Sequence, residues 1–229
     1  NTSGANNTAI GTSALSYNTT TSNNTAIGSQ ALYQVATNDN TAVGYSALNL
    51  ATTGIGRNTA VGSAALASIT TGDSNTAVGW KALNSNSTGY QNTYVGGNAG
   101  VLSTGFSNTV VGYGSLVQNT GYYNCVLGSD SLGFNTSGAA NVAVGRGAVY
   151  GNTTGLANVG VGAVTLRDNT TGSYNVALGY NALLHCTTGS GNISIGAVNS
   201  SGTYAPCYDV TTHTNIISMG SYSISDAYV

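Results

Sequence analysis

Few side chains in this sequence could support acid–base or nucleophilic catalysis. The six acidic residues are all aspartates: Asp39, Asp73, Asp130, Asp168, Asp209 and Asp226. No two of them share a repeat slot as a close carboxylate pair, which a glycosidase built on a repetitive fold would need. His185 and His213 fall on different segments, and no serine–histidine–aspartate arrangement is indicated. We therefore expect no catalytic residues and no enzyme.

The sequence also lacks the spacing of a metal or redox site. Its aspartates do not recur once per repeat beside glycines, which is the pattern that binds calcium in other solenoids. Cys125, Cys186 and Cys207 form no metal or redox motif, and their odd number and wide spacing favour free thiols over a Cys186–Cys207 disulfide. We expect no metal and no cofactor.

Aromatic side chains offer the binding chemistry that the composition best supports. Four of them directly follow a recurring glycine: Tyr45, Trp80, Tyr113 and Tyr180. Aromatic faces beside amides and hydroxyls suit sugar rings, so these residues are candidate contacts for a receptor or a host cell-surface glycan. Trp80 is the first candidate because it is the single tryptophan. The alternative is that these rings fill grooves between chains or cover the surface.

These residues are held on a repeat of about 17 residues. The phrase asparagine, β-branched residue, small residue, isoleucine or valine, glycine occurs twelve times, at steps of 16 to 18 residues. Its asparagines are Asn7, Asn24, Asn40, Asn58, Asn75, Asn92, Asn108, Asn124, Asn141, Asn158, Asn175 and Asn192. A period this short indicates one solenoid coil per repeat, with coils that bury apolar side chains only by stacking.

The repeat predicts an all-β parallel β-solenoid or β-roll. Residues 1–196 are expected to form twelve coils, and residues 197–229 an irregular C-terminal cap, neck or tip. The asparagines are assigned a structural role, because amides stacked at the strand spacing of about 4.8 Å form hydrogen-bonded ladders. The chain opens in mid-repeat, so we expect it to be a segment of a longer protein.

Alternation along a strand divides the slots of each phrase between two faces. The slot after asparagine holds threonine in early repeats and valine or isoleucine from Val142 onward, so we expect it to face inward with the isoleucine or valine slot. Cys125 occupies the same slot and is expected to be a small core residue. A leucine four residues after most of the glycines, such as Leu83, is also assigned to the core.

The small residue between these two slots is then expected to face outward. It is Ala9, Ala26, Ala42, Ala60, Ala77, Ala143 and Ala177 in seven of the repeats. An exposed stripe of alanines is a flat surface that another chain could cover. Parallel homo-oligomers place equivalent repeats side by side at every level, so we expect self-association along this stripe.

The phrase Asn-Thr-Ala-Val-Gly-x-x-Ala-Leu followed by Asn-Thr-Thr-Gly resembles the repeat shafts of bacteriophage tail fibres, many of which precede an endosialidase-type chaperone domain. The core phrase is also similar to the Val-Ala-Ile-Gly repeats of trimeric autotransporter adhesin heads, which are left-handed parallel β-rolls assembled as trimers. The resemblance covers residues 7–196. It implies a parallel homotrimeric structural fibre for adhesion and host attachment, in a virion or on a bacterial cell surface.

Composition argues against two classes of partner. Charged residues are 4% of the chain, and Arg57, Lys81, Arg146 and Arg167 are its only basic side chains apart from histidine. No basic cluster is available to neutralise a phosphate backbone, so nucleic acid is not expected as a partner. No apolar run approaches the roughly 20 residues that span a bilayer, so membrane insertion is not expected either.

Three functions stay open on the sequence alone. The first is a phage tail-fibre shaft that presents or contributes to host-receptor binding, and the second is a bacterial adhesin head. The third is a monomeric ice-binding solenoid, which would need threonines exposed in every rank. We disfavour the third because the threonine slot is expected to be buried.

Overall fold

A computed structural model describes residues 3–54, 56–196 and 212–219. The chain divides into two compact units, residues 1–120 (the first unit) and residues 121–229 (the second unit). Cys207, Asp209 and Asp226 lie outside the described residues.

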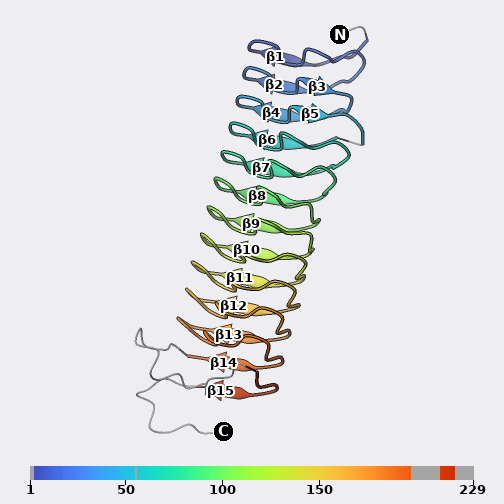
Figure 1. The fold of residues 1–229 in the computed structure, drawn as a ribbon. Coiled ribbons are helices and arrows are strands. Elements are labelled where there is room, and N and C mark those ends of the chain that lie inside the picture. Colours follow the sequence, from blue (N-terminus) through green and yellow to red (C-terminus); the bar gives the residue numbers. More distant parts are fainter. Residues whose placement is uncertain (1–2, 55, 197–211, 220–229) are drawn as a thin grey trace. The chain divides into compact units, whose positions relative to one another are not determined.

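The first unit is a stack of coils that each contribute one short strand to a parallel sheet (Figure 1). The strands, in sheet order, are β1 (Thr8–Ile10), β2 (Thr25–Ile27), β4 (Thr41–Val43), β6 (Thr59–Val61), β7 (Thr76–Val78), β8 (Thr93–Val95) and β9 (Thr109–Val111). Equivalent residues pair at every step, as in Thr59 with Thr76. A second sheet of two strands, β3 (Gln34–Val35) and β5 (Leu50–Ala51), lies in the same unit.

The second unit repeats this arrangement. Its strands are β10 (Cys125–Leu127), β11 (Val142–Val144), β12 (Val159–Val161), β13 (Val176–Leu178), β14 (Ile193–Ile195) and β15 (Ile217–Met219), paired in parallel in that order. The predicted C-terminal piece therefore contains a strand in register with β14, with Ile193 opposite Ile217. The described residues contain no helix, and so none that could cross a membrane. The predicted all-β parallel solenoid with coils of about 17 residues is confirmed.

The orientation predicted for the strand residues is wrong. The middle slot is fully buried in nearly every coil, and the two flanking slots are half-buried or exposed. The buried middle residues are Ala26, Ala42, Ala60, Ala77, Tyr94, Val110, Val126, Ala143, Gly160, Ala177 and Ser194. The strands that hold these middle residues therefore direct the middle residue into the coil and the two flanking residues out of it. The alanine stripe is core and cannot be the surface on which chains associate.

The leucine column is buried, as predicted, and it requires an unusual backbone. Leu83 and Leu166 are fully buried with φ of 49° and 47°, in the left-handed region. That conformation costs an L-residue about 1–2 kcal/mol, which the burial of a leucine side chain, at about 1.5–3 kcal/mol, offsets. The glycine after each strand has even less space for a side chain. At Gly79, with φ of 138°, a β-carbon would lie 2.5 Å from the carbonyl oxygen of Gly96.

In one coil of the first unit, the large core residue occupies the middle slot of the strand and the small one occupies the leucine position. Gly100 takes the leucine position, and the middle slot of β8 holds Tyr94, whose ring fills the space where a β-carbon on Gly100 would lie. The Tyr94 hydroxyl pairs with Ser103 Oγ at 3.0 Å, and burial raises the pKa of this phenol. The Tyr94 ring thus fills the space at the leucine position that Gly100 leaves open.

Candidate functional site

The orientation of the strands creates a flat outer surface in each unit, here called the outward sheet face. In the first unit its two columns are Thr8, Thr25, Thr41, Thr59, Thr76, Thr93 and Thr109, and Ile10, Ile27, Val43, Val61, Val78, Val95 and Val111. All fourteen side chains are half-buried or exposed, and none is charged. Parallel pairing in register places them in ranks about 4.8 Å apart.

The second unit has a more apolar outward sheet face. Its columns are Cys125, Val142, Val159, Val176 and Ile193, and Leu127, Val144, Val161, Leu178 and Ile195. Leu127 is 52% exposed, and Ile217 of β15 is 69% exposed. Cys125 is also exposed, so its predicted place in the core is wrong: it lies on this face. Sequence reasoning missed the outward sheet face because it took the change from threonine to valine as a sign of burial.

The repeat asparagines form a hydrogen-bonded ladder at the start of each strand. In the first unit the backbone N–H and the side-chain amide of Asn75 both donate to Asn58 Oδ1, at 3.0 and 3.2 Å. The same side chain donates to the carbonyl oxygen of Gly89, in the turn of the next coil, at 2.8 Å. In the second unit Asn192 Oδ1 accepts from the N–H of Ile216 at 3.0 Å. These amides are buried, and their bonds tie strand to turn.

A second buried asparagine column lies three residues after the leucine column. In the second unit Asn152 donates to Asn135 Oδ1, and Asn169 donates to Asn152 Oδ1, both at 2.7 Å. The next position in the column is Cys186, whose thiol donates to the carbonyl oxygen of Gly189. Asn169 Oδ1 is therefore buried without a hydrogen-bond partner among the described residues. The column could have been found from the regular spacing of Asn135, Asn152 and Asn169.

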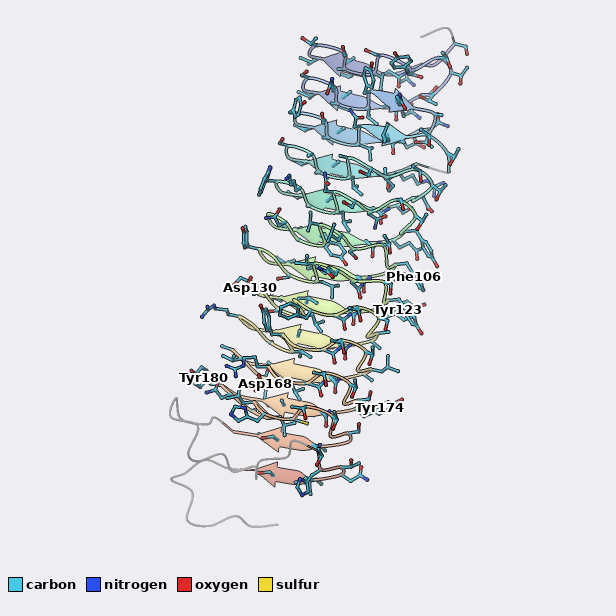
Figure 2. The ribbon with its side chains drawn as sticks, in the orientation of Figure 1. Phe106, Tyr123, Asp130, Asp168, Tyr174 and Tyr180 are labelled. Atoms are coloured by element: carbon cyan, nitrogen blue, oxygen red, sulfur yellow. The ribbon has the colours of Figure 1, made fainter. Side chains whose placement is uncertain are left out.

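The structure exposes all four predicted aromatic contacts but does not gather them into one pocket. In the first unit Tyr45, Trp80 and Tyr113 occupy the same slot in alternate coils, and Trp80 is 52% exposed. The ammonium group of Lys81 lies 4.8 Å from the centroid of the Trp80 ring. Tyr180 belongs to the second unit, where Figure 2 shows it on the same side as Asp130 and Asp168, opposite Tyr123 and Tyr174. All four rings are accessible to a ligand, and sugar stacking on them stays a prediction.

Arg167, Asp168 and His185 of the second unit gather in one place that sequence reasoning did not identify. Arg167 Nε lies 2.8 Å from Asp168 Oδ1, and His185 Nδ1 lies 2.8 Å from Asp168 Oδ2. Burial alone would raise the pKa of Asp168, but hydrogen bonds from Arg167 and His185 outweigh it and hold that pKa below its usual value. The hydrogen bond to Asp168 raises the pKa of Arg167. The positions of these residues in consecutive coils could have indicated the cluster.

The described residues contain no group of three histidine, cysteine or acidic side chains that could hold a metal ion. Comparisons of this chain with known protein families, with curated proteins and with solved structures found no match. The candidate sites for function are thus the outward sheet face, the exposed aromatic residues and the charged cluster of the second unit.

Proposed function

We propose that this chain is a segment of a structural and adhesion fibre, which associates with copies of itself through the outward sheet face. The observation that supports this proposal is the uninterrupted, uncharged and partly apolar surface on the strands of each unit. Contiguous apolar patches on soluble proteins usually mark interaction sites. The face of the second unit, with valine, leucine and isoleucine in almost every rank, has this character most strongly.

A second copy of the same chain suits this surface better than an unrelated protein. The face repeats one rank per coil in register, at about 4.8 Å, and a partner with the same period can pack against every rank. It carries no charge that would need a complementary partner. A parallel arrangement brings equivalent ranks together, so the contact made by one repeat is made by all.

The trimeric state and the biological setting come from the resemblance of the repeat. Phage tail-fibre shafts and autotransporter adhesin heads both support a parallel homotrimer, in a virion or on a bacterial surface. We favour the tail-fibre shaft because the phrase with Asn-Thr-Thr-Gly turns is closer to those shafts. The sequence that follows this segment in its gene would separate the two: a chaperone domain indicates a phage fibre, and a membrane-anchor barrel an adhesin.

The test is the mass of the purified segment by light scattering, with an arginine placed on the face or away from it. We expect three times the chain mass for the parent protein. Val159→Arg puts a charge in the centre of the second unit's face and should dissociate the assembly, because an unpaired charge would be buried. Thr154→Arg, at an exposed turn of the same unit, is the matched control and should leave the mass unchanged. A stable monomer for the parent protein would refute self-association.

The structure also supports a second candidate function, ice binding by the first unit. Sequence analysis disfavoured it because the threonines were expected to be buried, yet all seven strand threonines of this unit lie on the outward sheet face. A regular, uncharged array of hydroxyl and methyl groups could order water. A thermal hysteresis assay decides it: activity in the parent protein that Thr76→Arg abolishes would support ice binding, and no hysteresis would exclude it.

A further inference from the structure

Three charged residues of the second unit border an open pocket, here called the charged pocket. It is lined by Asp130, Arg146, Gly147, Tyr150, Val164 and Arg167. Asp168 completes the group by binding Arg167 at 2.8 Å. In a chain with 4% charged residues, this concentration at one hollow is the strongest departure from the repeat pattern.

The pocket arises because one coil lacks a side chain. Asp130, Gly147 and Val164 occupy the same slot, two residues after the repeat glycine, in three consecutive coils. A β-carbon on Gly147 would meet nothing within 4 Å, so the space beside this residue is open. The Asp130 carboxylate and the Val164 isopropyl group thus lie on either side of the open space at Gly147.

The lining offers hydrogen-bond donors, acceptors and an aromatic wall together. Arg167 is oriented by Asp168, which accepts hydrogen bonds from its Nε and Nη2 at 2.8 and 3.3 Å. Arg146 and Asp130 make no ion pair with each other. The Tyr150 ring is held edge-on to Phe134, with centroids 4.9 Å apart. The lining carries two guanidinium groups and one carboxylate, and Asp168 pairs with one of the guanidinium groups, Arg167. The group as a whole therefore has no net charge and does not favour a simple anion.

We propose that the charged pocket is a binding subsite for a sugar ring of a cell-surface glycan. Each sugar hydroxyl both donates and accepts hydrogen bonds, so it suits a site with free arginine donors and a free carboxylate, and the Tyr150 ring offers apolar contact. Tyr180 occupies the slot of Arg146 two coils further on, about 10 Å away, where it could contact a second ring. The inference gives the proposed adhesion function its ligand class, and it rests on that function.

The test uses ligand-observed NMR on the purified protein with the methyl glycosides of glucose, galactose, mannose and N-acetylglucosamine. We expect at least one to bind, on the order of millimolar, because a single ring makes few contacts. Gly147→Asn should abolish binding by filling the pocket. Asparagine occupies the same left-handed slot at Asn98 and Asn181, so the coil should remain folded. Arg146→Gln should weaken binding about tenfold through loss of the guanidinium donors.

Arg57→Gln is the matched control, since it removes the same charge from the first unit and should leave binding unchanged. Inorganic phosphate is the second control. Binding of phosphate but of no glycoside would mean an anion site and would overturn the proposal. So would the absence of binding by all four glycosides, or binding that survives in Gly147→Asn. These outcomes are independent of the mass measurement, so the subsite and the self-association of the fibre can fail separately.

Discussion

The two units share one backbone pattern but differ in the chemistry of the outward sheet face. The first unit presents threonine in every rank of one column, and the second presents valine or isoleucine in all but the rank of Cys125. The buried middle slots of both units are mostly alanine or another small residue. Size is therefore restricted inside the coil, whereas polarity varies outside it. Under our proposals, the second unit offers the better surface for self-association and the first unit the better surface for ordering water.

The largest effect should come from a charge placed inside a coil. Ala77 is fully buried in β7, and its neighbour Thr76 lies on the outward sheet face. Ala77→Arg should destabilise the first unit by more than about 3 kcal/mol, since it buries an unpaired charge in a small core. Thr76→Arg puts its charge outside the coil, so its cost should be clearly smaller and should come from weakened self-association rather than from the packing of the coil. Thermal unfolding of both variants would decide the matter, and equal melting temperatures would contradict the inward orientation of alanine.

The leucine column should contribute equally to the stability of both units, whereas the outward sheet face differs between them. Leu83 and Leu166 are fully buried in the first and second units. Replacing either by alanine should cost about 2–5 kcal/mol, because a cavity replaces a packed side chain. Hydrogen exchange should show the loss confined to the substituted coil and its neighbours. A small loss at one leucine alone would show that the two cores are packed differently.

Replacing the valines on the outward sheet face of the second unit by the threonines of the first tests the difference between the two faces directly. Replacing Val142, Val159 and Val176 together by threonine keeps the shape of the second unit's face but adds three hydroxyl groups. If that face drives association, the assembly should weaken by about 1 kcal/mol or more per chain, because hydroxyl groups would be desolvated. The dissociation constant can be measured by analytical ultracentrifugation. No change would place the interface elsewhere, and the reverse exchange in the first unit would be the next test.

Cys125 provides a test of register without a new side chain. It lies exposed on the outward sheet face of the second unit. In a parallel assembly in register, the Cys125 thiols of different copies lie at the same level. With Cys207 replaced by serine throughout, a short bismaleimide should then join chains covalently, and Cys125→Ser should prevent this while buried Cys186 remains. Cross-linked parent protein on a denaturing gel supports the parallel arrangement, and uncross-linked chains in a proven oligomer would argue against it.

The unpartnered amide oxygen of Asn169 predicts a stabilising substitution in the second unit. Asn169 Oδ1 is buried and has no partner in the described part of the chain, because Cys186 ends its column. Cys186→Asn should extend the ladder and donate a hydrogen bond to that oxygen, which we expect to stabilise the unit by about 1 kcal/mol. Chemical denaturation of the two proteins measures this difference. Destabilisation would mean that the last coil cannot accept the amide.

Much of the fold could be predicted from the sequence, but not which side of the strand is inside. The regular period of the asparagine and leucine columns indicated their roles, a hydrogen-bonded ladder and a core column, from the sequence. Alternation separates two faces of a strand without saying which one is buried, and Thr76–Ala77–Val78 fits both choices. The deciding factor is the narrow coil, in which Ala77 and Leu83 are both fully buried. The charged pocket was missed because it depends on residues of three coils.

The smallest predicted effect is a pH dependence confined to the second unit. Hydrogen bonds from Arg167 and His185 hold the pKa of Asp168 below its usual value, despite burial. A carboxylate whose pKa is lower in the folded state adds stability above its unfolded pKa, near 4, and loses it as pH falls through the folded pKa. Because Asp168 and its partners are partly exposed, the loss below about pH 4 should stay under roughly 1 kcal/mol. Asp168→Asn should remove this loss, whereas Asp73→Asn in the first unit should not. Denaturation between pH 7 and pH 3 would test this, and the same acid sensitivity in Asp168→Asn would assign it to other groups.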